Sequence, residues 1–315
     1  MTRTTTVSLV APSTFDWSTS SGPAEALRRL VSAAEAADRR SPLNEAAVLS
    51  LRHTGLTGST LFLADSEETG GTAAAADHAV GFALVTGDEV NLVVHPQHRG
   101  QGVGARLAWA VLGECGERPL TAWSHGNHPA AAALAASSGF RPVRDLWLMR
   151  RPLRDPLPPL RDVNNVAVRR FVVRQDEEAF LALNSAAFAH HPEQGRLSLD
   201  DLRQREAEPW FDPDGFFLAY STRRPGELLG FHWTKVHDDE DTAYGEVYVV
   251  GVSPSAQGAG LGKLLTLTGL YHLRDQGVGE VVLYVEADNA PAVAVYQKLG
   301  FTHADADTDV MYARG

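Results

Sequence analysis

Two short glycine-rich segments are the part of this sequence whose residue types and spacing most clearly suggest chemistry. Each has the form Gly-x-Gly-x-Gly and follows a Val-x-Pro tripeptide, between a valine-rich stretch and the expected start of a helix. Backbone amides at a helix N-terminus bind anions, and glycine lets the backbone approach a phosphate without an intervening Cβ. Each segment therefore predicts a pyrophosphate site. The glycines are Gly100, Gly102 and Gly104 in the first segment and Gly258, Gly260 and Gly262 in the second.

The two segments belong to an internal repeat. Val94 matches Val252 and Gly100 matches Gly258, both at an offset of 158 residues, and Gly139 matches Gly300 at an offset of 161. Self-similarity at a fixed spacing indicates duplicated structural units. The sequence therefore predicts an N-terminal domain at residues 1–150 and a C-terminal domain at residues 167–315. Between them, residues 151–166 carry four prolines and read as an extended linker.

Within each half, helices alternate with several strands. In the second half we expect helices at 175–189, 263–275 and 290–298, and strands at 217–220, 228–236, 247–252 and 281–286, with a last strand near Met311. The first half has a matching early helix at 24–38. This order predicts an α/β (α+β) fold in which each domain has a mixed, mostly antiparallel sheet flanked by helices.

The glycine segments differ from other phosphate-binding motifs. A dinucleotide fold uses Gly-x-Gly-x-x-Gly at its first strand–helix turn, with an acidic residue about 20 positions later. Here the spacing is shorter, each segment comes late in its half, and no Gly-Lys-Ser/Thr of a Walker A loop is present.

The composition of the chain excludes several classes of binding partner. The chain has 315 residues, a formal net charge of −11 and one cysteine. An acidic chain is a poor binder of nucleic acid, one cysteine forms no internal disulfide, and no apolar run approaches the roughly 20 residues that span a bilayer. His232 and His237 lie five residues apart on one strand, hence on opposite faces, so we expect no metal. We expect a cytoplasmic monomer that acts on a small molecule and binds neither nucleic acid nor a membrane.

The glycine segments resemble the GNAT acetyltransferase superfamily, whose Gln/Arg-x-x-Gly-x-Gly/Ala signature cradles the pyrophosphate of acetyl coenzyme A (acetyl-CoA). Both 97–102 and 257–262 fit this signature, and 289–301 resembles the family's final helix. The resemblance implies tandem GNAT domains with acetyl-CoA as co-substrate. The residues expected to bind the coenzyme are Leu92, Val93, Val94, Gly100, Gln101, Gly102, Val103, Gly104 and Ala105 in the first half, and Val250, Gly251, Val252, Gln257, Gly258, Ala259, Gly260, Leu261, Gly262, Lys263, Asn289, Ala290, Pro291, Ala292, Val293 and Ala294 in the second.

The second half also resembles tandem GNAT enzymes that acetylate the cysteinyl amine of a cysteinyl-glucosaminyl-inositol. Glu246 is the candidate general base because it stands at the start of the strand that ends in the second glycine turn, and the resemblance to the GNAT final helix implies Tyr296 as general acid. Ala135 stands at the position of Tyr296 in the first half and has no proton to give, so we expect only the second half to catalyse. The residues implied in substrate binding are Glu45, Glu193, Lys235, Glu246 and Tyr284.

Two alternatives stay open from the sequence. A tandem GNAT enzyme could acetylate another amine, such as a polyamine, an antibiotic or a protein N-terminus. A non-catalytic sensor of acyl-CoA would use the same glycine segments, although Glu246 and Tyr296 argue against it.

Overall fold

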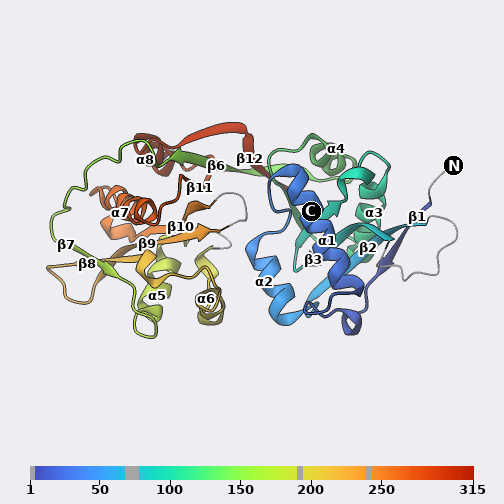
Figure 1. Cartoon of the computed structure of the whole chain (residues 1–315), viewed down its shortest axis with the longest axis horizontal. Coiled ribbons are helices and arrows are strands. Elements are labelled where there is room, and N and C mark those ends of the chain that lie inside the picture. The colour runs from blue at the N-terminus through green and yellow to red at the C-terminus, as the bar shows by residue number, and fades with distance from the viewer. Residues whose placement is uncertain (1–3, 68–77, 190–193, 239–242) are drawn as a thin grey trace. The chain divides into compact units, whose positions relative to one another are not determined.

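The computed structural model describes residues 4–67, 78–189, 194–238 and 243–315 (Figure 1). The chain forms two compact units. The first unit consists of residues 1–146 together with 305–315, and the second consists of residues 147–304. None of the described helices is both long and apolar enough to cross a membrane.

The first unit is built on a sheet with the strand order β1-β2-β3-β4-β5-β12. Its neighbouring strands pair in antiparallel fashion except β4 and β5, which are parallel. Its helices and strands are β1 (Thr4–Leu9), α1 (Gly22–Asp38), α2 (Glu45–Thr54), β2 (Ser59–Glu67), β3 (Ala79–Thr86), β4 (Glu89–Val94), α3 (Val103–Cys115), β5 (Leu120–Ser124), α4 (Pro129–Ser137), the start of β6 (Arg141–Pro152) and most of β12 (Thr302–Arg314).

The second unit repeats this arrangement. Its strand order is β6-β11-β10-β9-β8-β7, and β10 and β11 form its parallel pair. The pairs β7–β8, β8–β9 and β9–β10 are antiparallel. Its remaining elements are β7 (Val166–Arg170), α5 (Glu177–Ala187), α6 (Leu199–Glu206), β8 (Phe216–Ser221), β9 (Leu228–His237), β10 (Tyr244–Val252), α7 (Leu261–Asp275), β11 (Glu280–Glu286) and α8 (Ala290–Lys298).

These two sheets confirm the predicted fold class, a duplicated and mostly antiparallel mixed sheet with flanking helices. The compact units depart from the boundaries expected from the repeat. Residues 305–315 belong to the first unit, where 310–314 pair with β5. The expected linker also begins inside a structured region, because Arg151 and Leu153 are buried in the second unit.

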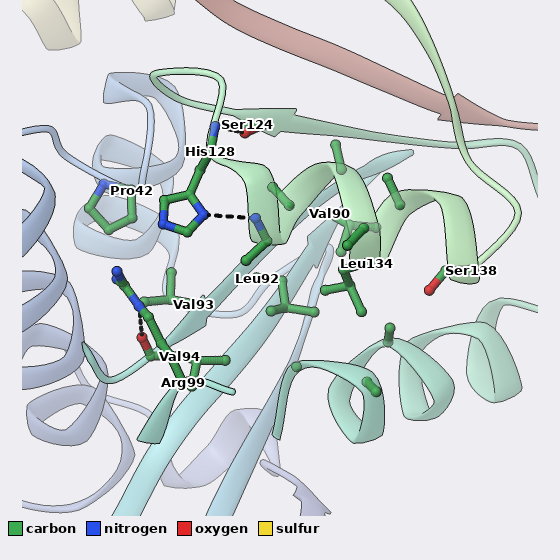
Figure 2. Close-up of a pocket in the computed structure, with 18 of the residues that line it drawn as sticks. Pro42, Val90, Leu92, Val93, Val94, Arg99, Ser124, His128, Leu134 and Ser138 are labelled. Carbon is green, nitrogen blue, oxygen red and sulfur yellow. Dashed lines mark hydrogen bonds between the residues drawn. The ribbon is translucent and has the colours of Figure 1, made fainter. Parts of the chain in front are cut away.

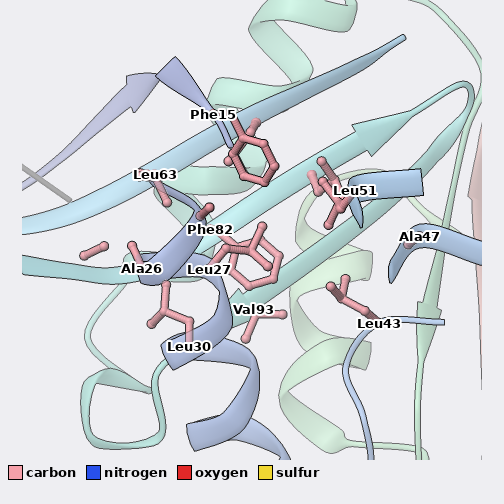
Figure 3. Packing of buried hydrophobic residues seen from close by; sticks show 14 of the residues in the cluster. Phe15, Ala26, Leu27, Leu30, Leu43, Ala47, Leu51, Leu63, Phe82 and Val93 are labelled. Carbon is pink, nitrogen blue, oxygen red and sulfur yellow. The ribbon is translucent and has the colours of Figure 1, made fainter. Parts of the chain in front are cut away.

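Both faces of the first sheet are covered, and alternate residues of β2 show how. Leu61 and Leu63 pack with Leu27 and Leu30 of α1 on one face (Figure 3). Phe62 and Ala64 pack with α3 on the other face. Because side chains alternate across a strand, a sheet covered on both sides requires a continuous apolar run.

The second sheet is covered in the same way. Phe216 and Trp233 stack with ring centroids 4.7 Å apart beneath α5 and α6. Phe217 and Leu229 lie on the opposite face, against Leu265 of α7. One face of each sheet thus packs against a long helix that begins directly after the second glycine of a glycine segment.

A buried histidine makes the second unit sensitive to acid. His232 of β9 is fully buried, its Nδ1 atom lies 2.7 Å from the Leu265 carbonyl oxygen, and burial lowers its pKa from 6.5 to about 4. An unfolded imidazole titrates near 6.5, so the unfolded state binds the proton more readily between pH 6.5 and 4. We expect His232 to contribute roughly 3 kcal/mol to the free energy of unfolding above pH 6.5, and this contribution to disappear as the pH falls to 4.

Urea unfolding of the native chain and of His232→Gln at pH 7 and pH 4.5 measures this contribution. The variant should lose less stability on acidification than the native chain does. Equal losses in both proteins would assign the acid sensitivity to other groups.

Candidate functional site

The two glycine segments have the same backbone geometry. Each begins with a 3₁₀ turn, at Pro96–His98 or Pro254–Ala256, and ends on a glycine that caps a helix. The capping residue Gly102 has φ 83° and ψ 0°, and Gly260 has φ 83° and ψ 4°. An L-residue with a side chain is strained at this φ, which explains glycine at both caps.

Both turns leave space for a ligand. A Cβ atom built on Gly100, Gly102, Gly258 or Gly260 would meet no atom within 4 Å. The first amides of a helix have no partner within the helix, so these turns present donors to open space. The predicted helix start at 263 is two residues late, because α7 begins at Leu261, directly after the capping glycine.

The strands on either side of each turn separate towards it. β4 pairs with β5 only at Glu89 and Thr121. β10 pairs with β11 only at Gly245–Glu246 and Val281–Val282. All four strands are fully described, and nearer the turn β4 does not pair with β5 and β10 does not pair with β11. The backbone of β4 and of β10 on this side can therefore bond a ligand that has amide groups of its own.

In the first unit this opening is a cavity of about 500 Å³ between β4, α3 and α4 (Figure 2). Of the coenzyme residues predicted in this half, only Gln101 does not line the cavity; its Nε2 atom donates to the Gln97 carbonyl oxygen at 3.0 Å. The predicted residues that line it are Leu92, Val93, Val94, Gly100, Gly102, Val103, Gly104 and Ala105.

Charged side chains at the first turn are already paired. Both terminal nitrogens of Arg99 donate to the Asp38 carboxylate at 2.7 Å, and this bonding raises the pKa of Arg99. Gln257 replaces this arginine in the second turn. In the first turn the attraction for an anion therefore comes chiefly from backbone amides and the helix dipole.

The helix after each opening is capped by a side chain. Asn289 Oδ1 accepts from the Ala292 amide at 3.2 Å, and its counterpart His128 accepts from the Ala130 amide through Nδ1 at 3.2 Å. Of the predicted residues on α8, Val293 is buried, whereas Asn289, Ala290 and Pro291 are exposed. In the second turn, the side chain of Leu261 is buried and that of Lys263 is exposed.

Glu246 makes a close contact that its strand position alone does not reveal. Its Oε2 atom lies 2.6 Å from Nε2 of His237, and the Glu246 side chain is 12% exposed. The His237 ring stacks on Tyr244 with centroids 4.4 Å apart. Tyr244 and Glu246 therefore both fix the position of the His237 imidazole, and the short contact with His237 fixes the orientation of the Glu246 carboxylate.

Strand β10 carries a bulge beside Glu246. The register between β10 and β9 shifts between Val247 and Val249, whereas β4 pairs with β3 without any shift. A bulge bends a strand and redirects its side chains and amides. Counted along the register, the first-unit equivalent of Glu246 is Glu89, whose Oε1 accepts from Asn44 and Asn91.

The predicted substrate residues fall into separate groups. Lys235 lies directly opposite Glu246 on β9, with its Nζ atom 4.2 Å from the centre of the Trp210 ring. Tyr284 is 45% exposed on β11. Glu45 is the first residue of α2 in the first unit. Glu193 lies outside the described residues.

Tyr296 is buried in the core of the second unit. Its side chain packs in the core formed by α7, α8 and β11, and its ring meets Phe301 edge-on at 5.9 Å. Burial raises the pKa of Tyr296 from 10.0 to about 12. The phenol is therefore protonated throughout the physiological pH range and is a hydrogen-bond donor.

Sequence reasoning missed two groups of residues. The spacing of His237 in the sequence does not reveal its contact with Glu246. In the described chain, no group of three or more His, Cys, Asp or Glu side chains could hold a metal. Asp309 was not considered, yet it is buried and accepts from Arg40 at 2.6 Å and from the Gly126 amide at 2.8 Å. Repeat matching would have found His128, at the position of Asn289, but it gives no information on these cross-strand partners.

Comparison with known proteins decides the family. The sequence model of the Acetyltransferase (GNAT) family matches residues 32–140 and 178–301. The chain belongs to this family. The two matches coincide with the two copies of the glycine turn, so both copies are GNAT acetyltransferase domains.

Curated relatives match nearly the whole of this GNAT chain. A mycothiol acetyltransferase of a Nocardioides species is 52% identical over 92% of this chain and 97% of its own length. A mycothiol acetyltransferase of Paenarthrobacter aurescens is 49% identical over 91% of this chain and 90% of its own length.

Solved structures share the tandem fold. A tandem GNAT protein from the clavulanic acid biosynthesis pathway has a TM-score of 0.67, with 21% identity over 98% of both chains. A GCN5-related N-acetyltransferase from Sphaerobacter thermophilus also has a TM-score of 0.67, with 22% identity over 98% of this chain and 95% of its own. At this identity the likeness concerns the fold alone.

Proposed function

We propose that this chain transfers the acetyl group of acetyl-CoA to the cysteinyl amine of cysteinyl-glucosaminyl-inositol, which completes the synthesis of mycothiol. The observation that carries the proposal is the identity of about half to curated mycothiol acetyltransferases over nine tenths or more of both chains. The two open turns and the unpaired strand edges beside them fit a coenzyme that has a pyrophosphate and an amide-bearing arm.

The second unit is proposed as the catalytic unit. It has Tyr296 where the first unit has Ala135, and its β10 strand has a bulge beside Glu246 that β4 lacks. The first unit is proposed to bind the coenzyme without catalysis. Acetyl-CoA, when bound, supplies an activated acyl thioester.

In this mechanism Glu246 takes the proton that the amine must lose. An α-amino group titrates near 7.7–8.0, so roughly a tenth is neutral at pH 7 and a modest base suffices. The hydrogen bond with His237 at 2.6 Å fixes the direction of the carboxylate. Lys235 and Tyr284 are proposed to line the substrate side of the same unit.

Tyr296 is proposed to stabilise the departing thiolate. Burial raises the pKa of Tyr296 to about 12, so the phenol keeps its proton and can act on the sulfur without complete proton transfer. Donation of a hydrogen bond needs no such transfer, and in buried surroundings it strengthens as negative charge develops on the sulfur.

A panel of amines tests the substrate. The purified chain is assayed with acetyl-CoA and cysteinyl-glucosaminyl-inositol, glucosaminyl-inositol, free cysteine, spermidine and a peptide with a free N-terminus. We expect kcat/KM to be at least 100-fold higher for the cysteinyl conjugate than for the other amines. An equal or higher kcat/KM for another amine would show that the proposed substrate is wrong, although the chain would still be an acetyltransferase.

A further inference from the structure

The two units differ in the size of the side chains that line equivalent positions of β5 and β11 and of α4 and α8. In the second unit, Leu283 and Tyr296 are 1% and 7% exposed and pack with Leu270 and Phe301 in one core. The equivalent residues of the first unit, at the offset of 161, are Ala122 and Ala135. Two large side chains of the second core are thus replaced by methyl groups in the first.

The first unit does not refill the space that these replacements leave. Leu112 and Phe140, which match Leu270 and Phe301, are only partly buried, and none of the residues of α4 is buried. Figure 2 shows α4 above Leu92, with Leu134 on the side of the helix that faces it. The result is the cavity of about 500 Å³, which runs from the glycine turn into this hollow.

Much of the cavity wall is apolar. Its apolar lining includes Ala108, Val111 and Leu112 of α3, Ala122 of β5, Ala135 of α4 and Phe140 directly before β6, and the polar residues Ser124, Ser137 and Ser138 also line the cavity. Arg40 and Arg99 line it as well, and they pair with Asp309 and Asp38. A ligand that fits has an anionic part at the turn and an uncharged, apolar part in the hollow.

We propose that the first unit binds a coenzyme A thioester whose acyl chain is longer than acetyl, with that chain in the Ala-lined hollow. The proposal rests on the proposed role of the glycine turn as a coenzyme site. Each methylene buried from water strengthens binding about fourfold, so butyryl-CoA, with two more methylenes than acetyl-CoA, should bind the first unit about 16-fold more tightly. The second unit, filled by Tyr296 and Leu283, should show no such preference.

Calorimetric titration of the full chain with acetyl-CoA and with butyryl-CoA tests this inference. We expect two sites per chain, one of which binds butyryl-CoA about 16-fold more tightly than it binds acetyl-CoA. Gly102→Ala in the first turn should weaken that site. Ala135→Tyr on α4, or Ala122→Leu on β5, should abolish the preference for butyryl-CoA over acetyl-CoA. Ala136→Tyr, on an exposed position of the same helix, is the matched control and should leave it intact.

The outcomes separate this inference from the proposed function. Equal affinities for the two thioesters at the first-unit site would overturn the inference alone, as would a preference that survives both Ala135→Tyr and Ala122→Leu. A single site per chain, with acetyl transfer retained, would overturn both the inference and the coenzyme role of the first turn. Turnover with acetyl-CoA should be unchanged in the control Ala136→Tyr, because this exposed position does not line the cavity.

Discussion

Replacing Glu246 by glutamine is expected to lower kcat/KM for acetyl transfer by about 10²–10⁴-fold, the usual contribution of a positioned general base. Glutamine retains the size of the side chain and a hydrogen bond to His237, but it does not accept the proton of the amine. Coenzyme affinity should stay within about twofold of native, since Glu246 lies at the far end of β10 from the glycine turn. Steady-state kinetics and calorimetry of the same preparation measure the two quantities.

His237→Gln separates proton transfer from positioning. If His237 only holds the carboxylate, this variant should lose about tenfold in kcat/KM, whereas Glu246→Gln should lose about 10²–10⁴-fold. Glu178→Gln, an exposed carboxamide substitution on α5, is the matched control. Native rates in Glu246→Gln would remove Glu246 from the mechanism.

Matched substitutions at Gly102 and Gly260 are expected to have unequal effects on turnover. Both residues cap a helix at φ 83°, and neither has an atom within 4 Å of a built Cβ. Alanine should therefore cost the two units similar stability, about 1–2 kcal/mol for an L-residue held in this region. It should also place a methyl group where the coenzyme pyrophosphate would lie.

The difference between the two variants identifies the catalytic unit. Gly260→Ala should lower kcat/KM for acetyl-CoA by about 10–100-fold, which is the loss of binding expected when one or two charge-assisted hydrogen bonds are removed. Gly102→Ala should weaken one of two coenzyme sites and leave the rate within about twofold of native. A rate loss in Gly102→Ala equal to that in Gly260→Ala would contradict an inactive first unit. Thermal melting of both variants is the control, and we expect their melting temperatures to be similar.

Some of this architecture could be predicted from adjacent residues. The strand, 3₁₀ turn, capping glycine and helix follow one another along the chain, so local backbone preferences determine the turn, and its repetition indicated two copies. Helix α8 was predicted at its observed bounds, 290–298, because Asn289 and Pro291 are strong signals for a helix start. The anion-binding geometry was therefore accessible without any tertiary information.

The partners of these local features come from distant parts of the chain. The pairing of Glu246 with His237 depends on the register between β10 and β9, and the bulge beside Glu246 has no signature in the spacing of its residues. Asp309 bonds Arg40, 269 residues earlier, because residues 305–315 complete the first unit and not the second.

The hollow in the first unit also required the structure. The sequence shows Ala122 and Ala135 where the second half has Leu283 and Tyr296, but alanine at two positions can mean either an empty space or a closer approach of the helices. Local sequence determined the two turns and the helices that follow them, because each depends on the conformational preferences of consecutive residues. Only the tertiary structure decided which carboxylate is held by an imidazole and where the space beneath the strands remains open, because both depend on how segments far apart in the sequence pack together.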